Sequence, residues 1–568
     1  MTPRTPKALQ GDIVWAGIAL AVLTLGIHGS ALNGWWRWDD PQILKHALLY
    51  SPWQYFMVPA AWQALHATLL TPWLTLSFNV DLTLFGLNPP AFYGHQLLLL
   101  WVAACMTYIL LRLWLDTLWS GLGAALFLSG VPVTVVVQEL MSRHYIEGLV
   151  FAILALHFFF RAIREGRPNL AWSGGFFYLL AVSAKEVYVP LVLFLPFVPE
   201  RDLRHRWRTA LPFLLVAVAY VPWRWHMLSV PIWVLDDHIV WQPVLRLPFR
   251  VVGPLIGNGA LGTAINLLIL ALLGIVLWRR WHLLLLTLVA LALITGPLVP
   301  VAVLIDHVAR YQFVAWWAFC CTIVLLFKWI GNFGRSGFFS ALVLYILVMG
   351  VVLYQGWQVR SSLRPVIKEF ETQGRFLWDA DKNDALLVAS PAFANHFWYA
   401  RGLVWVREKV KGDRQSHRLL VDEIELAEVD LSQTDVWAYD GHCGCMQNVS
   451  REVPRTLAKW QSRRLVRPLS IAIQYRKNLV SWQFGPYKDG AYSVVNGQWM
   501  GKLLIPARGQ RRTTLPAPSY DFYIRYDSPQ GWITYSSRLT FTPEKETSLV
   551  WERGHIESGI AMDRSSQF

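Results

Sequence analysis

Two adjacent carboxylates, Asp39 and Asp40, follow the first long apolar run of the chain and precede Pro41. A carboxylate can act as a general base when it lies within hydrogen-bond distance of a hydroxyl group. Because consecutive side chains point in different directions, we expect one carboxylate to face a substrate and the other to orient the loop. The alternative is purely structural, since Asp before Pro is also typical of a helix start.

A second charged pair, Lys185 and Glu186, interrupts the apolar stretch 179–195, where a helical hairpin must turn near the bilayer surface. Charges at such a depth are costly in free energy unless they form ion pairs or take part in the protein's function. A lysine there can bind a phosphate as a point charge, and Arg310 or Arg143 could add a bidentate guanidinium. The alternatives are that Lys185 reaches out to the lipid headgroups or pairs with Glu186.

The other ionisable residues of the apolar region collect at one end of the predicted helices. No chain of Asp, Glu or His runs through the helices as a proton or ion pathway would require. This distribution favours a reaction at a membrane surface over transport. Besides the residues above, the set contains Glu139, Asp306 and His307.

Two further groups have residue types that bind metals. Asp236-Asp237-His238 is favoured as a solvated loop, because adjacent residues rarely bind one ion together. Cys443 and Cys445, next to His442, could form a disulfide or a metal or redox site, and the sequence leaves these open. We therefore predict no definite cofactor and leave a divalent metal as an open alternative.

The composition places these residues in a membrane protein. Of 568 residues, 55% are hydrophobic and 15% are charged, and the mean hydropathy is +0.36. Many apolar stretches approach the roughly 20 residues that cross the hydrocarbon core of a bilayer. An ordinary soluble globular protein is excluded, as are a disordered chain and a nucleic-acid-binding scaffold. The net charge of +14 is then a topology signal, because most arginines before residue 340 lie between apolar stretches.

About eleven apolar stretches predict a polytopic α-helical core. If the first enters from the cytoplasm, every predicted inner turn carries arginine or lysine, as the positive-inside rule requires. The N-terminus is then cytoplasmic, and the chain after the last span is extracytoplasmic. The spans are expected at about 12–32, 92–115, 117–134, 145–160, 170–184, 187–199, 209–225, 263–279, 282–303, 312–331 and 337–356.

Three regions follow from this pattern. Residues 1–357 are expected to form the transmembrane core, with a long tryptophan-rich first outer loop at 33–91 that lies in the membrane interface. Residues 358–465 are expected to form a small mixed α/β domain. Residues 466–568 show short alternating strands separated by turn residues, which is typical of a β-sandwich.

Several runs of the first two thirds together resemble the membrane glycosyltransferases of the GT-C fold. Trp38-Asp39-Asp40-Pro41-Gln42-Ile43, Thr71-Pro72-Trp73-Leu74-Thr75-Leu76-Ser77-Phe78 and Phe85-Gly86-Leu87-Asn88-Pro89 resemble their first outer loop. The nearest resemblance is to the protein O-mannosyltransferase group that includes the tetratricopeptide-containing transmembrane mannosyltransferases. Ser183-Ala184-Lys185-Glu186 and Ala309-Arg310-Tyr311 resemble two later motifs of that group, in the same order.

The sequence also departs from that group. Pro132 is followed four residues later by Val136, where the relatives have Glu, and Arg310 is preceded by Ala309 instead of Glu. No tetratricopeptide repeats follow the membrane core. The chain therefore looks more like bacterial relatives that carry an outer soluble domain.

The resemblance implies an inverting glycosyltransferase that moves a sugar from a polyprenyl-phosphate carrier to an extracytoplasmic acceptor. The acceptor could be a protein, a lipid or a polysaccharide. The implied setting is a bacterial inner membrane, with membrane lipid but no nucleic acid as a partner. By position, Asp39 is expected to be the catalytic base, supported by Asp40. The resemblance further implies that the carrier phosphate is bound by Lys185, Arg310 and Arg143, with supporting contacts from Glu186, Glu139 and Tyr311.

Two other functions fit parts of the sequence. A transporter or flippase of a lipid-linked sugar would also need basic residues for phosphate, but it predicts charges within helices or broken helices in paired halves. A non-catalytic membrane protein could bind glycan or a partner through aromatic residues of its tail, although such residues in strands more often form a core. The aromatic residues in question are Trp482, Tyr487, Trp499 and Tyr520.

Overall fold

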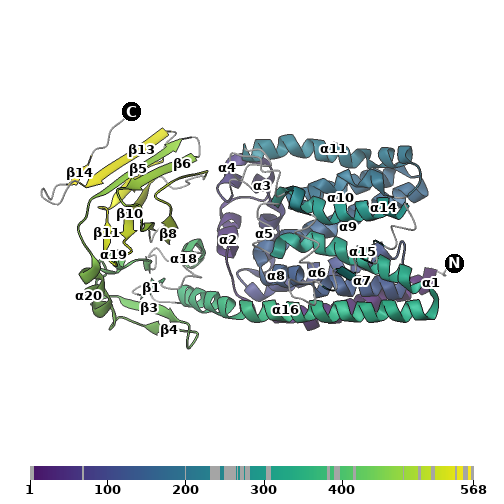
Figure 1. The fold of residues 1–568 in the computed structure, drawn as a ribbon, viewed down its shortest axis with the longest axis horizontal. Helices are drawn as coiled ribbons and strands as arrows, with labels where there is room; N and C mark the ends of the chain where they lie inside the picture. The colour runs from purple at the N-terminus through teal and green to yellow at the C-terminus, as the bar shows by residue number, and fades with distance from the viewer. Residues whose placement is uncertain are drawn as a thin grey trace. The chain divides into compact units, whose positions relative to one another are not determined.

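The structure is a computed structural model, and it divides into two units (Figure 1). The membrane unit comprises Met1–Gly34, Tyr50–Trp62 and Thr68–Arg364. The tail unit comprises Trp35–Leu49, Gln63–Ala67 and Pro365–Phe568. The structure describes residues 6–66, 69–198, 200–229, 244–247, 282–301, 309–379, 384–388, 397–412, 418–476, 479–496, 501–512, 519–543, 546–553 and 561–563, with a few positions between 264 and 274.

Some sequence predictions fall outside these residues. They are the span at 263–279, the Asp236-Asp237-His238 run, Asp306-His307 and Trp499. The predicted first outer loop is divided between the two units: residues 35–49, which carry both aspartates, belong to the tail unit.

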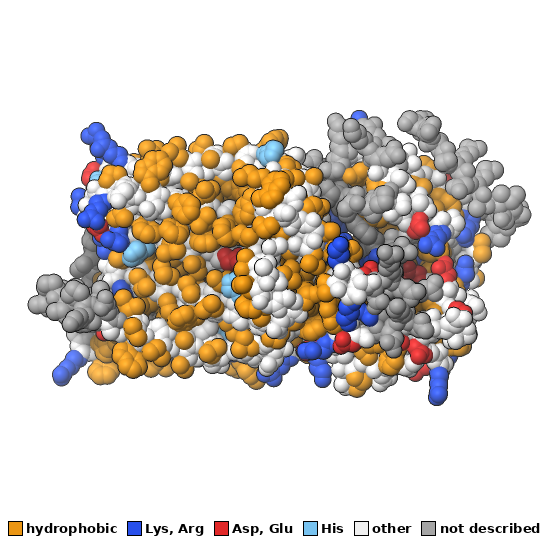
Figure 2. All heavy atoms as spheres, turned by 180° about the vertical axis from the view of Figure 1, so that it is seen from behind, with side chains coloured by type: hydrophobic (Ala, Val, Ile, Leu, Met, Phe, Trp, Pro, Cys, Tyr) orange, Lys and Arg blue, Asp and Glu red, His pale blue; other side chains and the backbone are white. Residues whose placement is uncertain are grey.

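Six helices in the described part of the chain are long and apolar enough to cross a membrane, or seven if a bent pair counts as one span. The expected polytopic α-helical fold is therefore confirmed. Large apolar side chains face outward along these helices, among them Trp15 (72% exposed) and Val218 (69% exposed). Hydrophobic side chains cover the helical part of the face in view in Figure 2, as contact with lipid requires. The six helices are α1 (Pro6–His28), α6 (Pro89–Leu111), α9 (Arg143–Glu165), α11 (Leu203–Leu228), α15 (Phe313–Gly331) and α16 (Gly334–Asp379).

The bent pair consists of α7 (Thr117–Ser129) and α8 (Val131–Gln138), which meet at 56°. Gly130 lies at the bend, and a Cβ atom there would come within 2.2 Å of the Trp316 indole nitrogen. Pro132 begins the second helix, where its missing N–H has no partner to lose. The close approach of Trp316 therefore requires glycine at the bend.

Shorter elements complete the membrane unit. Helix α10 (Pro168–Ala184) ends at Lys185, and the chain continues as 3₁₀ segments instead of the α-helical span expected at 187–199. Pro190 and Pro196 explain the difference, because proline removes a helix hydrogen bond and clashes with the preceding turn. The remaining elements are α3 (Gln54–Met57), α4 (Pro59–Gln63), α5 (Pro72–Phe85), α14 (His282–Thr295), η1 (Gly29–Asn33), η2 (Leu140–Ser142), η3 (Glu186–Leu193), η4 (Leu195–Phe197), η5 (Gly296–Val301) and η6 (Ala309–Gln312).

The first part of the tail unit is a mixed four-stranded sheet with the order β2-β1-β3-β4. β1 (Asp384–Leu387) pairs in parallel with β2 (Arg418–Leu420) and with β3 (Asp435–Asp440), and β4 (Cys445–Asn448) runs antiparallel to β3. Helix α18 (Phe397–Lys411) connects β1 to β2, as a parallel pair requires. Three further helices of this unit are α2 (Asp40–Leu49), α19 (Glu423–Leu426) and α20 (Val453–Arg463).

The second part of the tail unit consists of two five-stranded antiparallel sheets that share one apolar core. Tyr520, Phe522, Ile524 and Tyr526 alternate along β10 and all point into this core. The C-terminal α/β and β-sandwich region is therefore confirmed. One sheet contains β5 (Leu469–Arg476), β6 (Leu479–Gly485), β9 (Arg508–Arg512), β13 (Glu546–Arg553) and β14 (Ala561–Asp563); the other contains β7 (Ala491–Asn496), β8 (Gly501–Ile505), β10 (Tyr520–Asp527), β11 (Ile533–Tyr535) and β12 (Leu539–Phe541).

Arg525, on the opposite face of β10, joins the two parts of the tail unit. Its guanidinium lies 2.6 Å from Asp422 and 2.5 Å from Glu423, at the start of α19, and 2.7 Å from Asp527. The Tyr535 hydroxyl donates to Asp422 at 2.7 Å. Asp422 also has the ammonium of Lys502 at 3.0 Å. Removing Arg525 therefore leaves this buried carboxylate with one cation instead of two, and it also removes the guanidinium from Glu423 and Asp527.

We predict that Arg525→Met lowers the free energy of unfolding of the tail unit by about 1.5–3 kcal/mol, because buried charge-assisted hydrogen bonds are lost. The measurement is pulse proteolysis of the full-length protein in urea. Arg538→Met is the matched control, because Arg538 is half exposed and lies 3.4 Å from Asp521. Equal losses in the two variants would contradict this prediction.

Candidate functional site

The two aspartates have different environments at the start of α2. Asp40 is fully buried, and its carboxylate accepts the backbone N–H of Arg37 at 2.8 Å, which fixes the loop. Asp39 is partly exposed, and its Oδ1 accepts the indole N–H of Trp398 at 2.6 Å. Trp38 has a φ of 44°, a conformation that is uncommon for residues other than glycine. The turn therefore presents Asp39 while Asp40 orients it.

Lys185 lies where α10 ends, and it is 3% exposed. Its Nζ lies 5.3 Å from the centre of the Tyr145 ring, a cation–π contact. Burial lowers the pKa of Lys185 to about 8; the charge of Glu186 opposes this shift, and the charge of Arg310 adds to it. Arg310 is thus close enough to Lys185 for the two cations to repel each other.

Glu186 does not form an ion pair with Lys185. Its Oε1 lies 2.9 Å from Nε of Arg224 and accepts the backbone N–H of Leu70 at 3.3 Å. No carboxylate among the described residues lies within 4 Å of the Lys185 ammonium. Pairing with Glu186 therefore does not explain why Lys185 is buried.

Arg310 contacts Glu139 and the ring of Tyr311. Its Nη1 lies 2.9 Å from Oε2 of Glu139, which also accepts the Ser142 hydroxyl at 2.7 Å. The Arg310 guanidinium lies 5.5 Å from the Tyr311 ring, and that ring lies 6.5 Å from the ring of Tyr145. Lys185, Tyr145, Tyr311 and Arg310 thus form one chain of contacts, which we name the cation cluster.

The cation cluster contains a polar group that the sequence did not reveal. The Tyr145 hydroxyl is buried and has no hydrogen-bond partner within the described ranges. Buried polar groups are nearly always bonded, so an unpaired hydroxyl on a ring that contacts Lys185 favours a place for an oxygen-rich anion. The sequence offered only a weak signal, namely that Tyr145 follows Arg143 closely at the start of a span.

Arg143 lies in a separate buried network. It is 0% exposed, and its guanidinium bonds to Asp81 at 2.5 Å, to Ser77 at 2.9 Å and to the carbonyl of Phe92 at 2.8 Å. Asp81 also lies 2.7 Å from the His95 ring nitrogen. The structure thus brings Lys185, Arg310, Glu139 and Tyr311 together, whereas Arg143 joins α5, α6 and α9.

Metal ligands do not gather in the part of the chain that the structure describes. No group of three or more His, Cys, Asp or Glu side chains could hold an ion there. Cys443 and Cys445 form a disulfide in the turn between β3 and β4, so their thiols are not ligands in this state.

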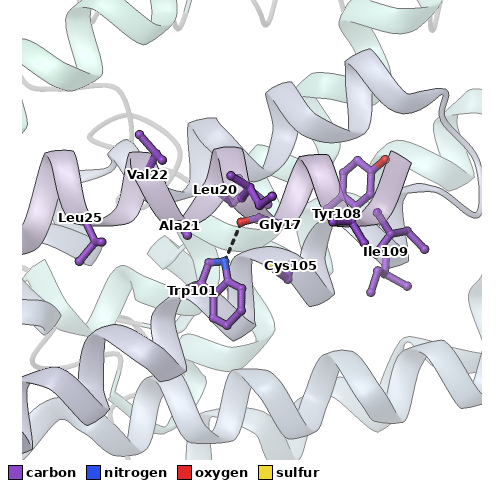
Figure 3. A pocket seen from close by; sticks show the side chains of 12 residues that line it. Gly17, Leu20, Ala21, Val22, Leu25, Trp101, Cys105, Tyr108 and Ile109 are labelled. Carbon is purple, nitrogen blue, oxygen red and sulfur yellow. Dashed lines mark hydrogen bonds between the residues drawn. The ribbon is translucent and has the colours of Figure 1, made fainter. Parts of the chain in front are cut away.

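An apolar groove of about 470 Å³ lies between α1 and α6 (Figure 3). Trp101 closes part of it and donates its indole N–H to the carbonyl of Gly17 at 2.9 Å. Cys105 and Tyr108 also line it, and none of its lining residues is charged. The groove therefore offers nothing that could bind a phosphate.

The tail aromatic residues that suggested glycan binding belong mostly to the sandwich core. Tyr520 is buried in the core, and Trp482 and Tyr487 pack against it. Trp482 also donates its indole N–H to the carbonyl of Pro506 at 2.9 Å. Their packing accounts for these residues without a ligand.

Comparison with known proteins finds likeness in structure but not in sequence. No protein-family model and no curated protein matches the sequence. The chain is similar to the crystal structure of the Archaeoglobus fulgidus oligosaccharyltransferase in complex with zinc and sulfate, with a TM-score of 0.38 and 11% sequence identity. The alignment covers 84% of this chain and 72% of that chain. Function is therefore inferred from the chain's own residues.

The Arg143 network generates a stability prediction. Arg143→Met leaves the buried carboxylate of Asp81 with the His95 ring but without its guanidinium. We therefore expect a loss of about 1.5–3 kcal/mol and a clear fall in Tm. The measurement is thermal unfolding of the purified protein in nanodiscs. Arg161→Met, at a side chain 43% exposed and paired with Glu165, should leave Tm nearly unchanged. A fall of the same size in both variants would count against the network.

Proposed function

We propose that the chain is an inverting glycosyltransferase with a GT-C fold, which moves a sugar from a polyprenyl-phosphate carrier to an extracytoplasmic acceptor. The observation that carries the proposal is the cation cluster. Lys185 is buried without a carboxylate partner among the described residues, beside a second cation and an unpaired tyrosine hydroxyl. A phosphate would offset the repulsion between the two cations and satisfy the hydroxyl.

In the proposed reaction, Asp39 accepts the proton of the acceptor hydroxyl. The hydroxyl oxygen attacks the anomeric carbon of the sugar, and the bond from that carbon to the carrier phosphate breaks on the opposite face. The phosphate leaves with the bonding electrons, and Lys185 and Arg310 stabilise its charge. A phosphate is a good leaving group, so no strong general acid is required.

The supporting residues take roles that fit their contacts. Asp40 orients the loop, and Glu139 holds Arg310 in place. Glu186 bonds Arg224 and the backbone of Leu70, and Tyr311 packs against Arg310. We assign Arg143 a positioning role instead of direct phosphate binding, because Asp81, Ser77 and Phe92 already occupy its guanidinium.

The proposed setting is a bacterial inner membrane with a cytoplasmic N-terminus and an extracytoplasmic tail. The Cys443–Cys445 disulfide supports this orientation, because disulfides persist mainly in oxidising compartments. The basic residues of the predicted inner turns support it independently.

The proposal predicts that the purified protein in nanodiscs turns over one member of a panel of labelled polyprenyl-phosphate sugars. Asp39→Asn and Lys185→Ala should each lower turnover by at least about 100-fold, because each removes a group that acts in the transition state. Thermal unfolding of each variant shows whether the fold is intact. Asp430→Asn and Arg161→Ala, at surface positions, serve as controls. Tight donor binding without turnover, unchanged by Asp39→Asn, would contradict catalysis and favour transport or binding.

Because the pKa of Lys185 is lowered to about 8, its amine is charged below pH 8 and neutral above it. We therefore expect the KM for the donor to rise above pH 8, by at most about tenfold per pH unit. Lys185→Arg should remove this rise, since a guanidinium stays charged throughout. The measurement is donor KM between pH 6.5 and 9.5. A rise of the same size in Lys185→Arg would show that another group is responsible.

A further inference from the structure

The segment that carries Asp39 is held by α18 of the tail unit. The Trp398 indole N–H donates to Oδ1 of Asp39 at 2.6 Å, and the Trp398 carbonyl accepts from the side-chain amide of Gln42 at 2.7 Å. Trp398 therefore bonds α2 through both its side chain and its backbone. These residues are 359 and 356 positions apart in sequence.

Further contacts hold the residues around Asp39. The Tyr399 hydroxyl lies 3.0 Å from the carbonyl of Trp36, and the Trp38 ring centre lies 5.8 Å from that of Phe370. One turn along α18, a Cβ atom on Gly402 would lie 3.0 Å from Cβ of Pro41, so the two helices touch there. Residues 398, 402 and 405 share one helix face by their spacing, and it is this face that packs on α2.

Near its C-terminal end, this face of α18 contacts Lys45 instead of Asp39. The Trp405 ring lies 5.3 Å from Nζ of Lys45, which is a contact with the flank of α2. Of the two tryptophans, only Trp398 bonds Asp39 in the part of the chain described. Trp405 therefore offers a matched comparison for any effect of removing an indole from this face.

The bond to Trp398 restricts the Asp39 carboxylate in a way that suits a base. A fixed donor on Oδ1 limits rotation of the carboxylate and leaves Oδ2 to accept a proton. Catalytic groups must be held close to their productive geometry, and a displacement of about 1 Å can lower the rate about 100-fold. Trp398 remains 41% exposed, so the bond lies at an accessible surface.

We propose that Trp398 is a positioning residue for the catalytic base, and that the tail unit is thereby part of the catalytic machinery. The inference rests on the proposed function, because it takes Asp39 as the base. It assigns the tail a role that does not depend on which acceptor the enzyme uses.

The test compares Trp398→Phe with Trp405→Phe in the nanodisc assay, with the donor that the panel identifies. Trp398→Phe keeps an aromatic ring but loses the N–H, so kcat should fall about 10- to 100-fold while the donor KM stays within about twofold. Trp405→Phe should keep both constants. A wild-type kcat in Trp398→Phe, or an equal fall in Trp405→Phe, would overturn the positioning role.

A second readout is independent of catalysis. Hydrogen–deuterium exchange of peptides covering residues 35–49 should become faster in Trp398→Phe and stay unchanged in Trp405→Phe. Unchanged exchange in Trp398→Phe would overturn the attachment even if activity falls. If Trp398→Phe does not fold, Gly402→Ala is the second variant, because its methyl group pushes α18 away from Pro41 and keeps every side chain in this contact.

The two proposals fail in different ways. Full turnover in Asp39→Asn would overturn the proposed function, while the exchange measurement would still decide whether Trp398 holds the segment. An inactive Asp39→Asn together with a fully active Trp398→Phe would overturn only the positioning role.

Discussion

The main constraint on the membrane unit is the buried ammonium of Lys185, which has no carboxylate beside it in the described part of the chain. Transferring a charge out of water is costly, and the usual remedy is an ion pair. Three buried or partly buried arginines form such ion pairs: Arg143 with Asp81, Arg224 with Glu186 and Arg310 with Glu139. Lys185 differs from these three arginines, since its ammonium contacts the face of the Tyr145 ring. A site that keeps one ammonium available while pairing its neighbours is suited to an anionic ligand that arrives and leaves.

The elements around Lys185 follow from local chain chemistry. Helix α10 ends at Ala184, and the prolines at 190 and 196 prevent the next segment from continuing as an α-helix. Lys185 therefore lies at a break between two apolar segments, where its backbone is extended. The bend at Gly130 similarly divides α7 from α8, and η2 then carries the chain from Glu139 to Arg143. Glu139, Arg143 and Lys185 thus lie at helix ends, whereas Asp81 and Arg224 lie within α5 and α11.

Much of the fold could be predicted from the sequence because its signals are local. Apolar length predicted the spans at α1, α6, α9, α11 and α15, and alternation predicted strands such as β10. Lys185 and Arg310 could also be identified as candidate site residues, since charges in apolar segments are rare. The partners of these charges could not be predicted. Glu139 and Arg310 are 171 residues apart, and Arg143 and Asp81 are 62 apart, so only the folded chain brings them together.

The roles of Asp39 and Asp40 also depend on long-range partners that the sequence does not reveal. Asp39 and Asp40 are consecutive, yet their roles diverge because one carboxylate turns inward to Arg37 N–H and the other meets an indole from α18. The positive φ of Trp38 costs about 1–3 kcal/mol. The buried Asp40 bond and the packing of Trp38 on Phe370 are available to offset it. A strained turn persists only where its surroundings determine it, and those surroundings come from the tail unit. The contacts of the cation cluster and the bond that holds Asp39 both join residues far apart in sequence, and no local pattern encodes them.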